Sequence, residues 1–221
     1  MRKALLAGGV LLLGLGIVGI SSAFAATKSP GLLRVGDVPG SFQQYAAPIA
    51  YTETTLLAVD AQACTETLQP IASPVGGVEA SFVRVGAPAG SLTLIEAVLV
   101  FPNAKAAAST FALVSKDHAA RLKCTTVGFI PQGSTTSGAP TMYQEAKFPK
   151  IGAGSYLESS GAPGTVDASA VVTFVSGPYL VRLGTFGTDP ITTTEFQKIA
   201  PRALKRLPVP TPIPPTTTTT P

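Results

Sequence analysis

Residues able to do acid–base chemistry are few and scattered in this sequence of 221 residues. The single histidine, His118, falls on the apolar stripe of a predicted helix, directly after Asp117. Neighbouring residues of a helix point about 100° apart, so Asp117 cannot orient the imidazole. Because His118 has no partner at metal-ligand spacing, we interpret it as a helix residue packed against the core, not as a general base or a ligand.

Motifs of the common catalytic classes do not occur after residue 25. The sequence has no G-x-S-x-G, H-E-x-x-H, P-loop or calcium-loop spacing. A glycosidase needs two convergent carboxylates, and the 12 acidic residues are too scattered to say which of them meet. We therefore predict no catalytic residue, no cofactor and no metal site, so the protein is not expected to be an enzyme.

One pattern, Gly14-x-Gly16-x-x-Gly19, matches the dinucleotide-binding fingerprint letter for letter. That fingerprint works only between a strand and the helix that receives the pyrophosphate. Here it lies within an apolar run from Ala4 to Ile20, near the start of the chain. The match therefore carries no nucleotide-binding function.

The first 25 residues have the plan of a secretory signal peptide. Arg2 and Lys3 precede the apolar run, and Ala23 with Ala25 form the A-x-A pattern that favours cleavage before Ala26. An uncleaved anchor is the alternative, but the run is short for a membrane span and its glycines weaken a helix. No cysteine ends the run, so a lipoprotein-type anchor is not expected. We predict a secreted or extracytoplasmic protein of the cell envelope, with no stable membrane span after processing.

The charge of the chain does not indicate a nucleic-acid partner. Removing Arg2 and Lys3 from the 16 cationic residues leaves 14 against 12 acidic ones. A nucleic-acid binder normally carries a strong basic stripe. One cationic group lies near the end of the predicted C-terminal helix, where it complements the helix dipole on a solvated face. Its members are Lys198, Arg202, Lys205 and Arg206.

The two cysteines, Cys64 and Cys124, predict a structural disulfide, because an even and small number in an exported protein favours pairing. Two buried thiols or a redox pair are the alternatives, and the lack of a C-x-x-C spacing weighs against the second. Closing a loop of this length is worth roughly 4 kcal/mol in the chain-entropy view.

Three helices are expected. Asp60 can cap a short helix through Leu68 that points Cys64 inward. Asn103 can cap a second helix over Ala104–Lys123, whose end the disulfide would tie to the first. The third begins at a T-x-x-E capping box and contains a proline that should kink or divide it. These last residues are Thr192, Glu195 and Pro201.

Most of the remaining chain has β character, after an irregular lead-in over Gly31–Pro48. Gly177-Pro178 predicts a tight hairpin between the last two strands, and a strand followed by a helix occurs twice. The candidate strands are Glu79–Val85, Leu92–Phe101, Thr125–Ile130, Thr141–Phe148, Ser155–Glu158, Ala168–Ser176 and Tyr179–Phe186.

This pattern predicts an α+β fold, with a mainly antiparallel sheet packed with two or three helices and one disulfide. We expect a signal peptide over 1–25, a single extracytoplasmic domain over 26–207 and a Pro/Thr-rich disordered tail over 208–221. The tail is also a candidate for O-glycosylation.

Several of these features together resemble a known family. They are a cysteine within Asp60-Ala61-Gln62-Ala63-Cys64, a strand ending in VLVFPNAKAAASTFALV, a helix closing on Cys124, a final strand–helix unit, and the opening Leu33-x-x-Gly36-Asp37-Val38-Pro39-Gly40. The arrangement resembles actinobacterial extracytoplasmic sensor-like domains: the ectodomains of PknH-type receptor kinases and related exported proteins, some with a Mog1/PsbP-like fold. The resemblance would cover about Leu32 to Leu207.

That resemblance implies a non-catalytic domain that binds ligands in a cleft. The chain departs from the family pattern because it has no kinase region, no lipobox, no membrane helix after the signal, and one possible disulfide where kinase ectodomains can carry two. No functional residue is therefore transferred from the family.

We accordingly predict a secreted, non-enzymatic sensor-like or ligand-binding domain of the bacterial envelope, with a small-molecule or lipidic envelope ligand. The alternatives are a structural or interaction protein that binds another envelope protein and uses the tail as a spacer, or an envelope hydrolase.

Overall fold

The computed structural model describes residues 31–38, 40, 42–51, 55–60, 62–70, 74–87, 94–125, 127–129, 141–161, 169–186 and 191–208. The predicted signal peptide with its cleavage site between Ala25 and Ala26, the Gly14–Gly19 pattern and the tail after Pro208 lie outside these residues.

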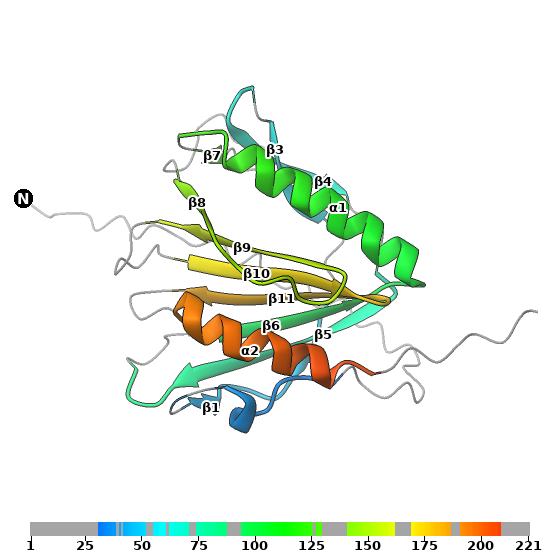
Figure 1. Cartoon of the computed structure of the whole chain (residues 1–221), viewed down its shortest axis with the longest axis vertical. Coiled ribbons are helices and arrows are strands. Elements are labelled where there is room, and N and C mark those ends of the chain that lie inside the picture. Colours follow the sequence, from blue (N-terminus) through cyan, green and yellow to red (C-terminus); the bar gives the residue numbers. More distant parts are fainter. Residues whose placement is uncertain are drawn as a thin grey trace, which may run out of the picture.

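A broad antiparallel sheet dominates the described part of the chain, in the order β1-β5-β6-β11-β10-β9-β8, with β2 also paired to β5 (Figure 1). Its strands are β1 (Phe42–Gln44), β2 (Ile49–Ala50), β5 (Gly76–Arg84), β6 (Leu94–Val100), β8 (Tyr143–Ala146), β9 (Gly154–Ser160), β10 (Ser169–Ser176) and β11 (Tyr179–Phe186). Ser176 pairs with Tyr179 across the two-residue Gly177-Pro178 turn, as the sequence predicted. The predicted α+β class with a mainly antiparallel sheet and one disulfide is confirmed.

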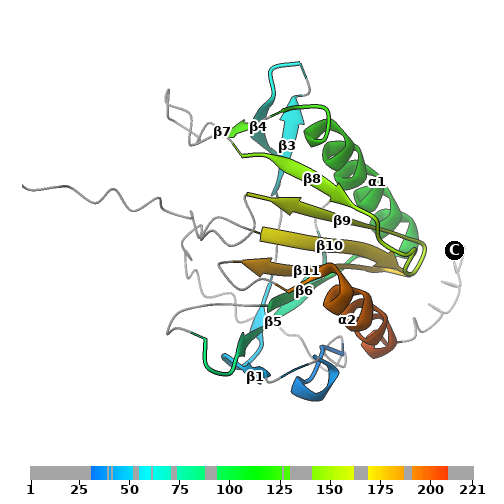
Figure 2. The same ribbon diagram turned by 60° about the vertical axis from the view of Figure 1, so that its left-hand side comes forward.

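A smaller sheet joins a hairpin to a third strand. The hairpin consists of β3 (Thr55–Asp60) and β4 (Thr65–Pro70), and β7 (Gly128–Phe129) pairs with β4 in parallel. The views in Figures 1 and 2 place this small sheet beside α1 (Ala104–Arg121). The other helices are η1 (Val35–Asp37), a 3₁₀ turn, and α2 (Thr193–Arg206).

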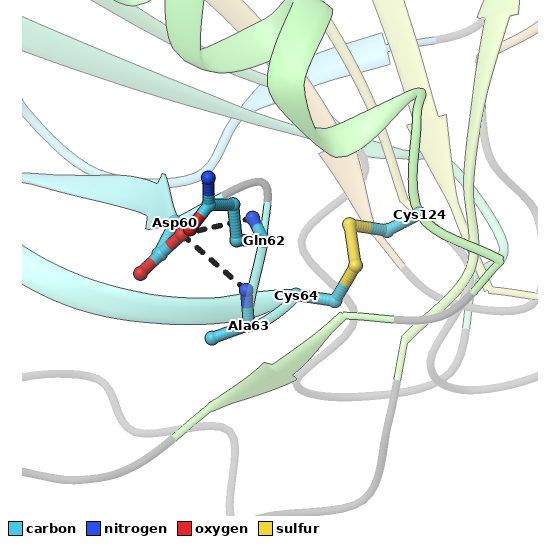
Figure 3. Close-up of a disulfide and its surroundings, with 5 residues drawn as sticks. All are labelled: Asp60, Gln62, Ala63, Cys64 and Cys124. Carbon is cyan, nitrogen blue, oxygen red and sulfur yellow. Dashed lines mark hydrogen bonds between the residues drawn. A yellow bond between two sulfur atoms is a disulfide. The ribbon is translucent and has the colours of Figure 1, made fainter.

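The predicted helix from Asp60 to Leu68 is wrong, because this segment turns from β3 into β4. Asp60 Oδ1 accepts the N–H groups of Gln62 at 2.9 Å and Ala63 at 3.3 Å (Figure 3). A carboxylate can accept from the free N–H groups of a tight turn as well as from those at the start of a helix. Asp60 therefore did not distinguish a turn from a helix start. Cys64 completes the turn with a φ of 49°, which is outside the helical range.

The lead-in over Gly31–Pro48 is more regular than expected. It contains η1 and β1, and β1 pairs with β5 so that Phe42 lies opposite Arg84. Val38 and Phe42 are buried, which anchors this segment on the sheet. The density of glycine and proline around these anchors concealed them from pattern analysis.

Both long helices begin where their caps predict. Asn103 Oδ1 accepts the Ala106 N–H at 2.9 Å, and Thr192 and Glu195 form a reciprocal capping box. Pro201 does not divide α2, which continues to Arg206.

The two helices lie on opposite faces of the main sheet. Leu180 belongs to the apolar cluster that contains Ala107 of α1, whereas Val181 belongs to the one that contains Phe196 of α2. Consecutive residues of a strand point to opposite faces, so β11 sends alternate side chains under each helix. We refer to these as the α1 face and the α2 face.

Candidate functional site

A cluster of charged and aromatic side chains lies between the C-terminal half of α1 and the α1 face. We call it the polar cluster, and it comprises Glu66 from β4, His118 and Arg121 from α1, Tyr143 from β8, and Tyr156 and Glu158 from β9. Tyr156 and Glu158 are two residues apart on a strand and so share a face. Helical spacing likewise puts His118 and Arg121 side by side. Regular local geometry therefore directs each of these two pairs to one side of its element.

The imidazole of His118 is held on two sides. Its Nδ1 lies 2.6 Å from Glu158 Oε2. In this hydrogen bond Nδ1 is the donor and the carboxylate oxygen is the acceptor. The ring stacks on Tyr156 with centroids 4.3 Å apart and planes 10° apart. Only 5% of His118 is exposed, and its Nε2 is buried with no hydrogen-bond partner among the residues that the structure describes.

Arg121 joins two acidic residues from different elements. Its Nε donates to Glu66 Oε1 at 2.8 Å, and its Nη1 lies 3.8 Å from Glu158 Oε2. Burial by itself would lower the pKa of Arg121, but Glu158 and Glu66 together raise it. The guanidinium thus remains charged and holds β4, α1 and β9 together.

Two tyrosines complete the cluster. The Tyr143 hydroxyl donates a hydrogen bond to Glu66 Oε1 at 3.1 Å. The guanidinium carbon of Arg121 lies 5.4 Å from the centroid of the Tyr143 ring. Burial raises the pKa of Tyr143, and the charge of Glu66 raises it further. Burial also raises the pKa of Tyr156. Both phenols therefore stay protonated, and Tyr143 acts as a donor.

The disulfide fixes the outer wall of this cluster. Cys64 and Cys124 are bonded with an S–S distance of 2.10 Å and a Cα–Cα distance of 5.8 Å (Figure 3). The predicted pairing is confirmed, although the bond ties the end of α1 to the β3–β4 hairpin and not to a helix. Glu66 lies two residues after Cys64, and Arg121 lies three before Cys124. The covalent bond and the ion pair therefore cross-link the same two segments.

A pocket of about 170 Å³ opens on the same face, beside the polar cluster. Its polar lining residues are Tyr51, Glu79 and Arg182. Its apolar lining residues are Ile95, Ala97, Val171 and Gly184. The lining thus combines one acidic and one basic side chain with a mainly aliphatic surface, in a pocket smaller than most drug-sized ligand sites.

Strand register explains why the pocket adjoins the polar cluster. Glu79 pairs with Ala97, Ala97 with Arg182, Arg182 with Thr173, and Thr173 with Tyr156. This row of paired residues crosses the α1 face from β5 to β9 and ends at the tyrosine that supports His118. In the next row, Val171 of the pocket pairs directly with Glu158 of the cluster.

The α2 face contains one fully buried carboxylate, Glu96. Glu96 is 0% exposed, and its Oε2 accepts the Leu33 N–H at 2.6 Å. Its Oε1 is buried without a hydrogen-bond partner in the described ranges. Burial raises the pKa of Glu96 to about 7, opposed by the Leu33 N–H and reinforced by the charge of Asp37.

Asp37 connects the N-terminal segment to α2. Arg206 donates to both of its carboxylate oxygens, at 2.9 and 3.0 Å, and Arg202 donates to its backbone carbonyl at 2.6 Å. The hydrogen bond from Arg206 holds the pKa of Asp37 below its usual range. Two of the cations predicted to lie on a solvated face therefore anchor a neighbouring segment.

The polar cluster positions segments but lacks the arrangement of a nucleophilic site. A histidine paired with a carboxylate is half of a catalytic triad, and its other nitrogen must reach a hydroxyl or thiol. Ser115 Oγ, one turn before His118, is buried but forms no hydrogen bond with it or with another described residue. Within the ranges given above, no group of three or more His, Cys, Asp or Glu residues could hold a metal ion.

Sequence reasoning placed His118 on the buried stripe of α1 but missed its partner. Asp117 was dismissed correctly as an orienting group, and Glu158 takes that place from 40 residues further along the chain. Glu66 was missed because the segment containing it was predicted as a helix. The disulfide was the one available signal, since it brings the neighbours of Glu66 and Arg121 together.

The chain was compared with family models, curated proteins and solved structures. No family model matches the sequence, and no curated protein matches it. The structure is similar to the extracellular domain of PknH from Mycobacterium tuberculosis, with 19% sequence identity and a TM-score of 0.47, over 79% of this chain and 92% of that one. This is the kind of domain that the sequence resembled, and the likeness concerns the fold alone. In the described part of the chain, no helix is long and apolar enough to cross a membrane.

Proposed function

We propose that this protein is an extracytoplasmic, non-enzymatic binding domain that takes a small envelope ligand in the pocket on the α1 face. The observation that carries the proposal is the pocket of about 170 Å³ whose lining joins Glu79 and Arg182 to an aliphatic surface. A concave apolar site with a few convergent polar groups is the general form of a ligand site.

The surroundings of the pocket support a binding role. The polar cluster beside it is cross-linked by hydrogen bonds, ion pairs and the disulfide. A wall held in this way reduces the ordering cost of binding, because little of it has to be immobilised by the ligand. The disulfide itself favours an oxidising compartment, in agreement with the predicted export signal.

A non-enzymatic role is favoured by the way in which the polar cluster uses its groups. The carboxylates of Glu66 and Glu158 accept from Arg121 and His118, so they act as structural partners of cations. A catalytic carboxylate or histidine would instead face the space that the substrate occupies.

The proposal is tested by native mass spectrometry of the protein purified from the organism that produces it. We expect a bound small molecule that is lost on denaturation. Ala97→Leu fills the pocket and should abolish its retention, whereas Ala112→Leu, which adds the same volume on the exposed side of α1, should leave it unchanged. Protein without bound ligand that also binds nothing from envelope extracts would overturn the proposal.

A further inference from the structure

We propose that the exposed side of α2, together with η1, docks the protein on an anionic membrane surface. We call this docking surface the basic ridge, and it comprises Arg34, Val35, Lys198, Arg202 and Lys205. It lies on the α2 side of the main sheet, whereas the pocket opens on the α1 face. The charge of the ridge, its exposure and the route of the chain into the domain all favour a membrane as its partner.

Three cations form one stripe along α2. Lys198, Arg202 and Lys205 follow one another at intervals of four and three residues, so they lie within about 60° around the helix axis. All three side chains are exposed. The residues that bury the opposite side of the helix against the sheet are Phe196, Ile199, Ala200 and Ala203. The stripe therefore points away from the core of the domain.

The N-terminal segment widens this stripe. Arg202 donates to the Asp37 carbonyl at 2.6 Å and Arg206 donates to the Asp37 carboxylate at 2.9 Å, which holds η1 along the side of α2 (Figures 1 and 2). At the start of η1, Arg34 is exposed and Val35 is 41% exposed. The basic ridge thus adds a fourth cation and an apolar side chain to the stripe on the helix.

Acidic side chains do not cancel this charge. The acidic residues of α2 and of residues 31–38 are Glu195 and Asp37, and both are half-buried. Asp37 is paired with Arg206, and Glu195 Oε1 lies 3.5 Å from Arg84 Nη2. Every exposed charged side chain of these two segments is therefore cationic, which favours an anionic partner.

The route of the chain favours a membrane over a soluble anionic partner. Gly31 packs so closely on the end of α2 that a Cβ atom there would collide with the carbonyl oxygen of Arg206. The apolar run of the predicted signal ends at Ile20, eleven residues before Gly31. A chain of that length spans at most about 40 Å. While the apolar run is in the bilayer, the end of α2 is therefore kept near a membrane surface.

Binding through the basic ridge should be reversible and sensitive to salt. Each Lys or Arg near an anionic bilayer increases partitioning about fivefold, so the four cations together increase it roughly 600-fold. The Debye length falls from about 10 Å at 0.1 M salt to about 3 Å at 1 M, which screens this attraction. In the docked orientation, the α1 face and its pocket point away from the bilayer.

Co-sedimentation of the mature chain, residues 26–221, with lipid vesicles tests the proposal. We expect binding to vesicles that contain phosphatidylglycerol, release from them at about 1 M salt, and little binding to pure phosphatidylcholine. Lys198→Gln combined with Lys205→Gln should weaken binding to the anionic vesicles roughly 25-fold. Arg202 is left intact because it also anchors η1.

A matched control removes two exposed lysines from α1, on the other side of the sheet. Lys105→Gln combined with Lys116→Gln lowers the net charge equally and should leave vesicle binding unchanged. Equal weakening by the two double variants, or equal binding to the two kinds of vesicle, would overturn the proposal. Binding to dextran sulfate that requires Lys198 and Lys205, without binding to anionic vesicles, would show that the ridge recognises a soluble polyanion and that the membrane assignment is wrong.

Discussion

The two faces of the main sheet bury their side chains in different ways. On the α2 face, α2 and the N-terminal segment cover a continuous apolar core, and Glu96 is its only fully buried ionisable residue among those described. On the α1 face, an apolar contact at the start of α1 gives way to the polar cluster and the pocket. Apolar burial is non-directional, whereas buried charges require fixed partners. The α2 face is therefore held mainly by apolar burial, and the α1 face also depends on matched polar partners.

Removing a ring from the α2 face should have the largest effect on stability. Phe196 is fully buried between α2 and the sheet, so we expect Phe196→Ala to cost about 5 kcal/mol of unfolding free energy. Phe111→Ala on α1 is the matched control and should cost about half as much, because that ring is only partly buried. Urea unfolding measures both. Equal costs would show that the two faces contribute alike.

Removing the disulfide should loosen the outer wall of the α1 face more than the rest. Replacing Cys64 and Cys124 by alanine is expected to cost about 4 kcal/mol, since the bond closes a loop of 60 residues. Hydrogen exchange should accelerate first in the β3–β4 hairpin and the end of α1, while α2 retains its protection. Uniform acceleration over the whole sheet would contradict a local role for this bond.

Breaking the ion pairs tests whether the polar cluster depends on matched charges. Arg121→Met leaves the buried Glu66 without its cation, whereas Glu158 keeps His118 as a partner, and we expect a loss of about 3 kcal/mol. Adding Glu66→Gln removes the uncompensated charge of Glu66 while keeping an acceptor for Tyr143, so the double variant should recover part of this loss. A double-mutant cycle by urea unfolding measures the recovery. Additive losses would show that the pair is not coupled.

The smallest expected effect is on the pH dependence of the unfolding free energy. It comes from Glu96, the one fully buried carboxylate of the α2 face. The pKa of Glu96 is about 7 when folded and near the ordinary 4.5 when unfolded, so the folded state binds the proton more tightly. Stability from this group is complete below pH 4.5 and is lost as the pH rises through about 7. Glu96→Gln cannot ionise and should be more stable than the wild type at pH 8 by on the order of 2 kcal/mol.

Urea unfolding between pH 5 and pH 8 measures this difference. Near Glu96, Asp37 contributes charge from the N-terminal segment, and Arg202 and Arg206 contribute it from α2. Asp37→Asn serves as the control, because it removes the adjacent negative charge while leaving Glu96 ionisable. An unchanged pH dependence in Glu96→Gln would show that another group is responsible.

Local signals predicted much of the fold from the sequence. Asn103, the Thr192–Glu195 capping box and the Gly177-Pro178 turn each fix structure through neighbouring atoms, and each was found where expected. The Asp60 signal failed because a side-chain acceptor near free N–H groups is common to helix starts and to tight turns. Local chemistry thus identified caps and turns better than it identified the elements they join.

The candidate site could not be predicted in the same way, because its members come from distant segments. Arg121 and Glu66 are 55 residues apart, and His118 and Glu158 are 40 apart. Glu79 and Arg182 meet on one row only through the pairing of β5, β6 and β11. Register between distant strands is decided by the whole sheet, and a single sequence does not reveal it. The cysteine pair alone gave an advance indication of which segments meet.

The central place of β11 has a consequence for the order in which the chain can fold. β11 lies between β6 and β10, although residues 179–186 come late in the sequence. Until they are available, β6 and β10 each present an unpaired edge. Such edges are prone to pair with other chains. A nascent chain that ends before β11 is therefore an aggregation hazard, and the main sheet is completed only when residues 179–186 are available.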